Sequence, residues 1–475
     1  MAMEARLKLA RKIPALILPA MLAIAAVAQQ GGSGTPPFTL EGALNYALSH
    51  YPAVRTAMER RTAARGGIGL ARTAYLPTAN ALWQGNRATR NNIFGLLLPQ
   101  SVVPSISGPV LTSTSNRGVW GSAAGLLLSW EPFDFGYRRA EVDLARANER
   151  VASAGVEISR LDVGSAAANA FFAVVAAQQQ VRAAQADVDR RQVFSRVVHA
   201  LVNNQLRPGA DASRSDAELA AARIALIQAQ VQERVARAEL GDLLGMPTAN
   251  LVLDAAPLLQ IPPAAMPGGN VTSNPEATAQ NARVQETAAQ VRAAGRSYYP
   301  RFNLQGSISG RGTGANLDGS FAGGTTGLDL QRENWAAGLT ASFPVLDIFS
   351  IRARKQIAEA NQRAETARYQ QTLQDLSAQV AEAQARLDGA IAIAQATPAE
   401  LQSARDSESQ ARARYQAALA NIVEVTEAQS LLVRAETEDA VAKLNAWQSL
   451  AALAVAQGDL NPFLQIVRTM SKGGH

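Results

Sequence analysis

The stretch RFNLQGSISGR, Arg301–Arg311, changes character from one residue to the next. Its even positions carry Phe302, Leu304 and Ile308 with two glycines, whereas every odd position is polar or charged. Successive side chains of a strand point to opposite faces. The period of two therefore predicts a β-strand with one apolar and one polar face.

The same alternation recurs in neighbouring segments. The odd positions from Trp335 to Phe343 are apolar, and Trp120 shares one face with Trp130 and with Ala124, Leu126 and Leu128. Strands are predicted at 77–90, 116–135, 300–312 and 333–348.

The size of the apolar face distinguishes two kinds of sheet. Ten residues separate Trp120 from Trp130, which is about 33 Å along a strand and about 25 Å of height at a tilt of roughly 40°. A soluble sheet packed by one face is the alternative. The terminal aromatics and the long loops at 91–115 and 312–332 favour an outer-membrane β-barrel, with Trp120, Trp130, Trp335 and Phe343 as membrane-interface aromatics.

Four strands cannot close a transmembrane barrel, and an open sheet edge is not tolerated in lipid. The chain is therefore expected to assemble with copies of itself. The N-terminus predicts an exported protein, as a membrane assembly of this kind requires. Residues 1–28 are typical of a signal peptide, with a basic start, the apolar run Ile13–Ala25 and an Ala-Val-Ala cleavage site.

Internal matches predict a duplicated unit. Pro52 and Pro77 are spaced like Pro275 and Pro300, and the segment from Asp134 matches that from Asp347 in register. The expected first repeat, 29–245, holds a helix, two strands, a long helix at 136–205 and a returning helix at 211–244. A proline-rich linker at 246–273 precedes the second repeat, 274–458, with a long helix at 349–418 and a returning helix at 421–456. Residues 459–475 form the expected C-terminal tail.

The helical segments carry two further expectations. The first helix is expected at about Thr39 to Thr73 with Thr39 as its N-cap, and Pro398 is expected to kink or interrupt the second long helix. Leu373, Leu376, Val380, Ala383 and Leu387 step by three and four, which is typical of a coiled-coil seam.

Composition excludes several classes of site. The chain has no cysteine and three histidines, so no cofactor, metal or thiol chemistry is expected. The formal charge is +6, but four cations and one acid lie in the first twelve residues. The remaining charges are mixed in sign along the helices, so no nucleic-acid partner is expected.

The stretch YQAALANIVEVTEAQSLL, Tyr415–Leu432, places Glu424 and Glu427 three residues apart in an apolar setting. Residues at this spacing share a helix face. Two solvated side chains on an exposed helix are the plain alternative. The stretch has a counterpart at Leu201–Ala220.

In this order, these features resemble the TolC-like outer-membrane efflux proteins, also called outer membrane factors. The resemblance implies a mainly α-helical fold with transmembrane β-strands, in which a homotrimer forms a 12-stranded β-barrel continued by a periplasmic α-helical barrel. It implies an exit duct in the outer membrane for a tripartite efflux pump or a type I secretion system. A periplasmic adaptor and an inner-membrane transporter would be its partners, beside outer-membrane lipid.

The resemblance also assigns a periplasmic aperture to Asp211, Tyr415, Glu424 and Glu427. Threefold symmetry would place six carboxylates of Glu424 and Glu427 around a narrow axis, which favours cations. The sequence departs from the family at Ala418, where a turn glycine is usual, at Gln205 in the other copy, and at Ala420, where some members carry an arginine. The family's Arg-Tyr-Asp contact is therefore expected to be absent or replaced.

Two other classes of protein compete with the channel. A periplasmic coiled-coil adaptor or structural protein without a pore would also carry helical hairpins, but the two-faced strands argue against it. An enzyme using Glu424 and Glu427 as an acid–base pair lacks any surrounding pocket-forming pattern. The expectation is a channel that is not an enzyme.

Overall fold

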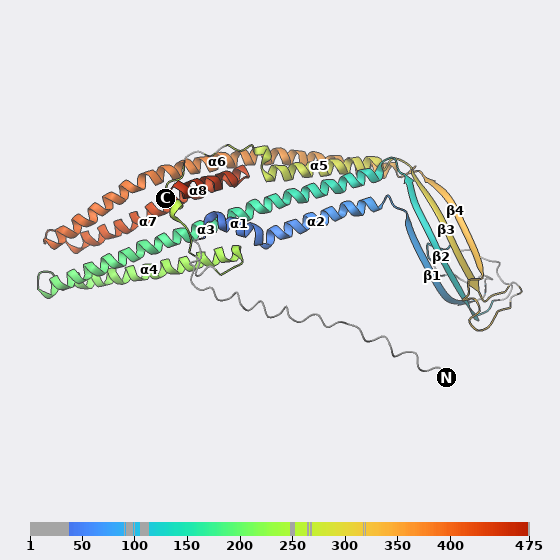
Figure 1. Cartoon of the computed structure of the whole chain (residues 1–475), viewed down its shortest axis with the longest axis horizontal. Coiled ribbons are helices and arrows are strands. Elements are labelled where there is room, and N and C mark those ends of the chain that lie inside the picture. The colour runs from blue at the N-terminus through green and yellow to red at the C-terminus, as the bar shows by residue number, and fades with distance from the viewer. Residues whose placement is uncertain are drawn as a thin grey trace, which may run out of the picture.

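The computed structural model describes residues 38–89, 91, 98, 100–104, 114–247, 252–263, 266, 268–316, 318 and 320–473. The expected signal peptide lies outside them. Long helices form most of an elongated molecule, and a four-stranded sheet projects from one end (Figure 1). The elements are α1 (Leu40–His50), α2 (Pro52–Thr73), β1 (Thr78–Thr89), β2 (Gly118–Phe133), α3 (Tyr137–Asn203), α4 (Gly209–Leu244), η1 (Ala256–Leu259), η2 (Val271–Ser273), α5 (Pro275–Arg296), β3 (Arg301–Thr313), β4 (Arg332–Ser342), α6 (Ile348–Gln416), α7 (Ile422–Gln457) and α8 (Asn461–Gly473).

Corresponding helices of the two halves match in length and in their ends. Helices α2 and α5 each have 22 residues and begin at a proline. Helices α4 and α7 each have 36 residues and end at a left-handed glycine, Gly245 and Gly458. A glycine there lets the chain turn without a Cβ penalty, so equivalent sequence signals end equivalent helices.

The structure corrects four local expectations. The first helix is two helices, because Tyr51 before Pro52 takes an extended conformation. Strand β4 ends at Ser342, so Phe343 follows the strand, and Pro344 has no backbone N–H to extend the ladder. Helix α6 continues through Pro398, so the expected break is wrong, while the alternative of a kink stays a prediction. The expected tail contains helix α8.

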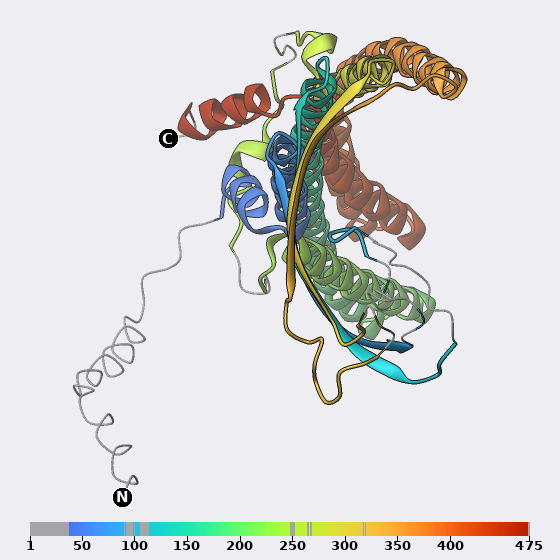
Figure 2. The ribbon, with the colours of Figure 1, turned by 90° about the vertical axis from the view of Figure 1, so that its right-hand side faces the viewer.

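The sheet is antiparallel in the order β1-β2-β3-β4 and is strongly curved when seen along the molecule (Figure 2). Its register aligns Ala81, Leu126, Ile308 and Trp335 in one row. Directly paired residues share a face, so this row belongs to the predicted apolar face. Leu126, Ile308 and Trp335 are 41%, 68% and 81% exposed. The sheet thus presents large apolar side chains outward, and β1 and β4 each pair on one side only.

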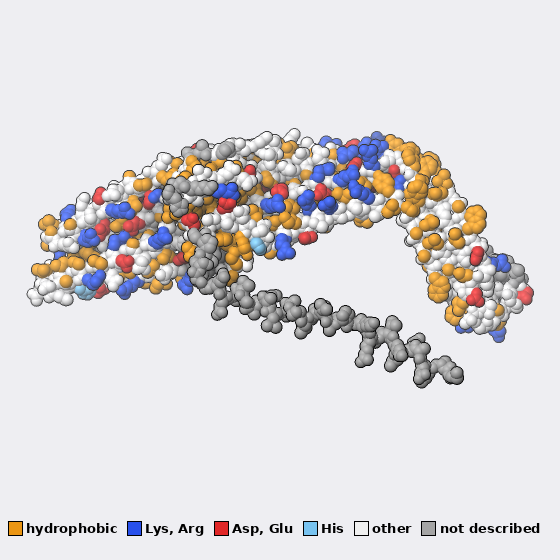
Figure 3. Space-filling view, in the orientation of Figure 1, with side chains coloured by type: hydrophobic (Ala, Val, Ile, Leu, Met, Phe, Trp, Pro, Cys, Tyr) orange, Lys and Arg blue, Asp and Glu red, His pale blue; other side chains and the backbone are white. Residues whose placement is uncertain are grey.

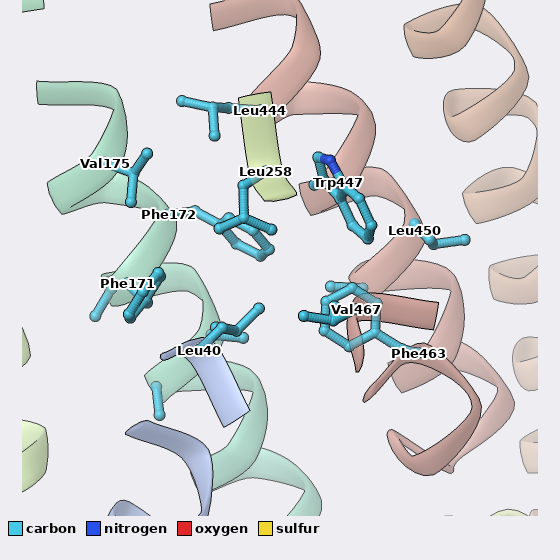
Figure 4. Close-up of a cluster of buried hydrophobic side chains, with 14 of the residues drawn as sticks. Leu40, Phe171, Phe172, Val175, Leu258, Leu444, Trp447, Leu450, Phe463 and Val467 are labelled. Atoms are coloured by element: carbon cyan, nitrogen blue, oxygen red, sulfur yellow. The ribbon is translucent and has the colours of Figure 1, made fainter. Parts of the chain in front are cut away.

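A hydrophobic core joins the two halves near the middle of the molecule. Phe171 and Phe172 of α3, Trp447 of α7 and Phe463 of α8 are fully buried there (Figure 4). The indole N–H of Trp447 donates to the Gln260 carbonyl at 2.8 Å. The one described helix apolar and long enough to cross a membrane is α3, and half of its apolar window is buried. That burial marks α3 as a core helix, which packs against α4 of its own hairpin and against α7 of the other hairpin.

Candidate functional site

Both helical hairpins turn at the end of the molecule farthest from the sheet (Figure 1). At the second tip, between α6 and α7, Ala418 adopts a left-handed conformation with φ of 61°. Leu419 N–H donates to the Arg414 carbonyl at 2.8 Å, and Ala418 N–H donates to the Tyr415 carbonyl at 3.1 Å. This pair of bonds is the Schellman motif that closes a helix C-terminus.

The first tip, between α3 and α4, has the same backbone. Gln205 has φ of 60°, and the amides of Leu206 and Gln205 each donate at 2.9 Å, to Leu201 and Val202. Both tips therefore hold a residue with a Cβ where glycine is favoured, which costs roughly 1–2 kcal/mol per residue. Gln205 and Ala418 therefore replace the expected turn glycines without disrupting either turn.

Tyr415 is the central side chain of the site. It is fully buried and packs edge-on against Phe194 of α3, with ring centroids 5.4 Å apart. Its hydroxyl donates to Asp211 Oδ2 at 2.8 Å. The structure therefore brings Asp211 and Tyr415 together, from α4 and α6, as two of the four predicted aperture residues.

Arg207 completes this cluster, and the sequence reasoning missed it. Its guanidinium donates to the carbonyls of Tyr415 and Ala420, the latter at 3.2 Å, and lies 4.2 Å from the Tyr415 ring centroid. Arg207 is the repeat counterpart of Ala420. The expected arginine–tyrosine contact is thus made by an arginine of the other copy, and the register of the two copies was the signal that could have found it. We call Arg207, Asp211 and Tyr415 the tip cluster.

The environment of Tyr415 keeps its phenol protonated. Burial raises the pKa of Tyr415, and the hydrogen bond to Asp211 and the negative charge of that residue raise it further, while the charge of Arg207 opposes the shift. A neutral phenol is the form that donates to a carboxylate. The tip cluster can therefore act as a polar latch between the two hairpins.

Glu424 and Glu427 do not join the tip cluster. Both are exposed in the first turns of α7. The Glu424 carboxylate lies 4.0 Å from Arg414 of the same hairpin, while its backbone N–H donates to the Asn421 side chain. Among the described residues, the Glu427 carboxylate has no hydrogen bond or ion pair. Glu424 thus has a long ion pair within its own hairpin, whereas the exposed Glu427 carboxylate has no partner among the described residues.

A second polar layer lies farther along the hairpins. Arg190 of α3 forms a two-point contact with Glu436 of α7, at 3.1 and 2.8 Å. Arg191 donates to Asp187 and to Glu218 of α4, each at 2.8 Å. Burial raises the pKa of Asp187, and the neighbouring Arg191 counteracts this. No pattern in the sequence pointed to this layer, which joins α3, α4 and α7.

The predicted interface aromatics are distributed over the outward face of the sheet. Trp130 is exposed near the helical end, and its indole N–H donates to the Tyr75 carbonyl at 3.0 Å. Trp120 is half-buried near the loop end, Trp335 pairs with Ile308, and Phe343 is exposed just after β4. Trp83 is 71% exposed on the same face and was not predicted. A membrane-interface role for the four aromatics remains a prediction.

Within the described ranges, no group of three or more His, Cys, Asp or Glu side chains is arranged to hold a metal ion. The tip cluster offers hydrogen bonding and charge.

The chain is similar to known outer-membrane proteins. A family model described as "Outer membrane efflux protein" matches residues 43–246 and 271–459. Protein CyaE of Bordetella pertussis is 26% identical over 427 residues, which cover 88% of this chain and 83% of that protein. Outer membrane protein OprJ of Pseudomonas aeruginosa is 24% identical over 400 residues, or 81% and 77% of the two chains.

Solved structures share the fold. The outer membrane protein VceC of Vibrio cholerae gives a TM-score of 0.69 at 20% identity, over 88% of this chain and 96% of that one. At this level of identity the likeness concerns the fold alone.

Proposed function

This chain belongs to the outer membrane efflux protein family, and on that premise we propose that three copies form one passive channel through the outer membrane. The channel would be the exit duct of a tripartite efflux pump or a type I secretion system. A periplasmic adaptor and an inner-membrane transporter would deliver the substrate and supply the energy.

The sheet is the observation that carries the proposal. Its outward row of Leu126, Ile308 and Trp335 is exposed, and its edge strands β1 and β4 each lack a second neighbour. In lipid every backbone N–H and C=O needs a partner. Three copies of four strands would close a 12-stranded barrel and pair every edge.

Exposed apolar side chains on the returning helix α4 support assembly of the copies along the helical part of the molecule. Ile224, Ile227, Val231 and Val235 are all 40% or more exposed and follow one another by three or four residues. Such spacing places them in one stripe on the helix. We propose that this stripe packs against the neighbouring copy in the α-helical barrel.

The tip would form the periplasmic aperture. The tip cluster holds the two hairpins of one copy together, and Glu424 and Glu427 would line the entrance around the axis. A ring of carboxylates favours cations. Substituting Glu424→Gln together with Glu427→Gln is expected to weaken cation selectivity, and unchanged reversal potentials in a salt gradient would contradict that assignment.

Membrane fractionation followed by native mass measurement in detergent tests the assembly. We expect a trimer in the outer-membrane fraction that conducts ions in planar bilayers. A soluble periplasmic monomer would overturn the proposal and favour the adaptor class.

A further inference from the structure

A pocket of about 660 Å³ lies where the helices meet the sheet, at the opposite end from the tip cluster. The start of α3, the end of α5 and Lys355 of α6 line it. None of its side chains takes part in the aperture or in the core between the hairpins. The pocket therefore calls for its own explanation.

The pocket is strongly cationic. Arg139, Arg292, Arg296 and Lys355 line it, and Asp143 is the one carboxylate among the lining residues. Asp143 already pairs with Arg146, outside the lining, at 2.7 Å. The positive charge of the pocket is therefore left largely uncompensated.

The four cations differ in how far they are engaged. Arg296 donates to the Phe135 carbonyl at 3.3 Å, and Lys355 lies 3.6 Å from Glu359. Arg139 and Arg292 are exposed, and neither forms an ion pair within the described part of the chain. Two guanidinium groups thus remain free to donate paired hydrogen bonds to the oxygen atoms of an anion such as a phosphate.

Aromatic side chains connect the pocket to the outward face of the sheet. Phe135 and Tyr299 line it and stack with ring centroids 5.3 Å apart. Phe135 also lies 6.3 Å from Phe302, which belongs to the apolar face of β3. The cationic pocket therefore opens at the foot of the apolar surface.

Exposed apolar side chains extend this surface around the corner between β4 and α6. Leu346 and Phe349 are 81% and 72% exposed. Figure 3 shows Lys and Arg side chains gathered at this end of the helices, beside hydrophobic side chains at the corner. An apolar surface bordered by cations matches a lipid, which carries acyl chains and a charged headgroup on one molecule.

We propose that this pocket binds the phosphate headgroup of an anionic glycerophospholipid from the periplasmic leaflet of the outer membrane. The acyl chains lie along the apolar face, and Arg139 and Arg292 hold the phosphate. The inference rests on the proposed function, because it requires the sheet to stand in that membrane. A soluble phosphate would use the cations but leave Leu346 and Phe349 exposed to water.

Native mass spectrometry of the purified, delipidated trimer tests the proposal, with phosphatidylglycerol, phosphatidylcholine and inorganic phosphate as probes. The wild type is expected to retain phosphatidylglycerol about tenfold more tightly than phosphatidylcholine, and high salt is expected to narrow this difference. Arg139→Gln with Arg292→Gln is expected to remove the preference. The single substitution Arg292→Gln, at an exposed position, is expected to reduce the preference for phosphatidylglycerol.

Arg363→Gln with Arg405→Gln provides the matched control, because these exposed arginines lie on α6 away from the pocket. The control pair is expected to bind like the wild type. Equal retention of both lipids, an equal loss in the control pair, or full competition by inorganic phosphate would overturn the lipid site. Trimer mass and conductance are recorded for every variant, so a conducting trimer without lipid preference rejects only this site, whereas a protein that forms no trimer rejects the channel itself.

Discussion

The two hairpin tips share a backbone but not their side chains. Each ends its long helix with a Schellman motif around a left-handed residue, Gln205 in one and Ala418 in the other. The first tip contributes Arg207 and the second contributes Tyr415, and neither residue has a like counterpart in the other copy. The two tips thus share the turn, whereas the contact between them depends on side chains that differ.

This difference separates two requirements of a channel tip. Turning the chain back needs only hydrogen bonds within one hairpin, so both copies retain them. Holding two hairpins together needs complementary groups, and identical tips would present like side chains to each other. The following variants test whether the tip cluster follows this division.

The largest effect is expected from Tyr415→Ala. It removes a buried aromatic ring and leaves Arg207 and Asp211 without their shared partner, at a cost of about 3–5 kcal/mol. Amide hydrogen exchange at the tip is expected to accelerate and single-channel conductance to rise. The counterpart change Val202→Ala, at a half-buried site, is expected to cost only about 1 kcal/mol. If the two variants changed amide exchange and conductance equally, the proposed difference between the two tips would be wrong.

Arg207→Ala is expected to come next. It removes a charged donor from two carbonyls and a cation from the face of Tyr415, for a loss of about 1.5–3 kcal/mol. Conductance should rise while the helical content stays unchanged. Arg214→Ala removes an exposed charge from the first turns of α4, just after the turn that holds Arg207, and should leave conductance as in the wild type.

The tip cluster is also expected to persist at alkaline pH. The raised pKa of Tyr415 means that its stabilising contribution is complete below the ordinary value of about 10 and is lost only as pH rises through the higher folded value. The difference in ultraviolet titration between the wild type and Tyr415→Phe should therefore show this phenol ionising above its ordinary value of about 10. A difference spectrum that titrates near pH 10 would mean that the phenol is not held in this cluster.

The smallest effects concern the feature that the tips share. Gln205→Gly and Ala418→Gly each relieve a left-handed Cβ and are expected to stabilise their tip by about 0.5–1 kcal/mol, seen as slower amide exchange. The neighbouring changes Asn204→Gly and Ala417→Gly, where φ is −89° and −79°, should instead destabilise. Opposite changes in stability at adjacent positions would show that relief of backbone strain, and not loss of the side chain, causes the effect.

Much of the fold could be predicted from local patterns. The alternation in Arg301–Arg311 identified the apolar face that the register assembles, and the repeated glycines Gly245 and Gly458 marked two helix ends. Boundaries at Tyr51 and Ser342 were missed because adjacent prolines changed the backbone locally. Helix α8 was missed although Phe463, Leu464, Val467 and Met470 recur at helical spacing, a signal that could have found it.

The candidate site was predictable only in part. The family resemblance identified Asp211 and Tyr415, and the structure joins them through a hydrogen bond. Arg207 escaped because its partner lies in the other repeat, more than two hundred residues away. Arg190 escaped for the same reason, because Glu436 lies in the other repeat. The contact of Arg191 with Glu218 escaped because charges on a helix surface look alike until the neighbouring helix is in place.

The sequence by itself determined the four strands and the long helices and where the two returning helices end, and it predicted two copies of one unit. Those properties depend on side-chain periodicity and on backbone preferences that act over a few residues. Only the tertiary structure decided that Arg207 takes the place left open by Ala420, and that four cations converge beneath the sheet. Both arrangements depend on distances between helices far apart in the chain, which packing sets and local preference does not.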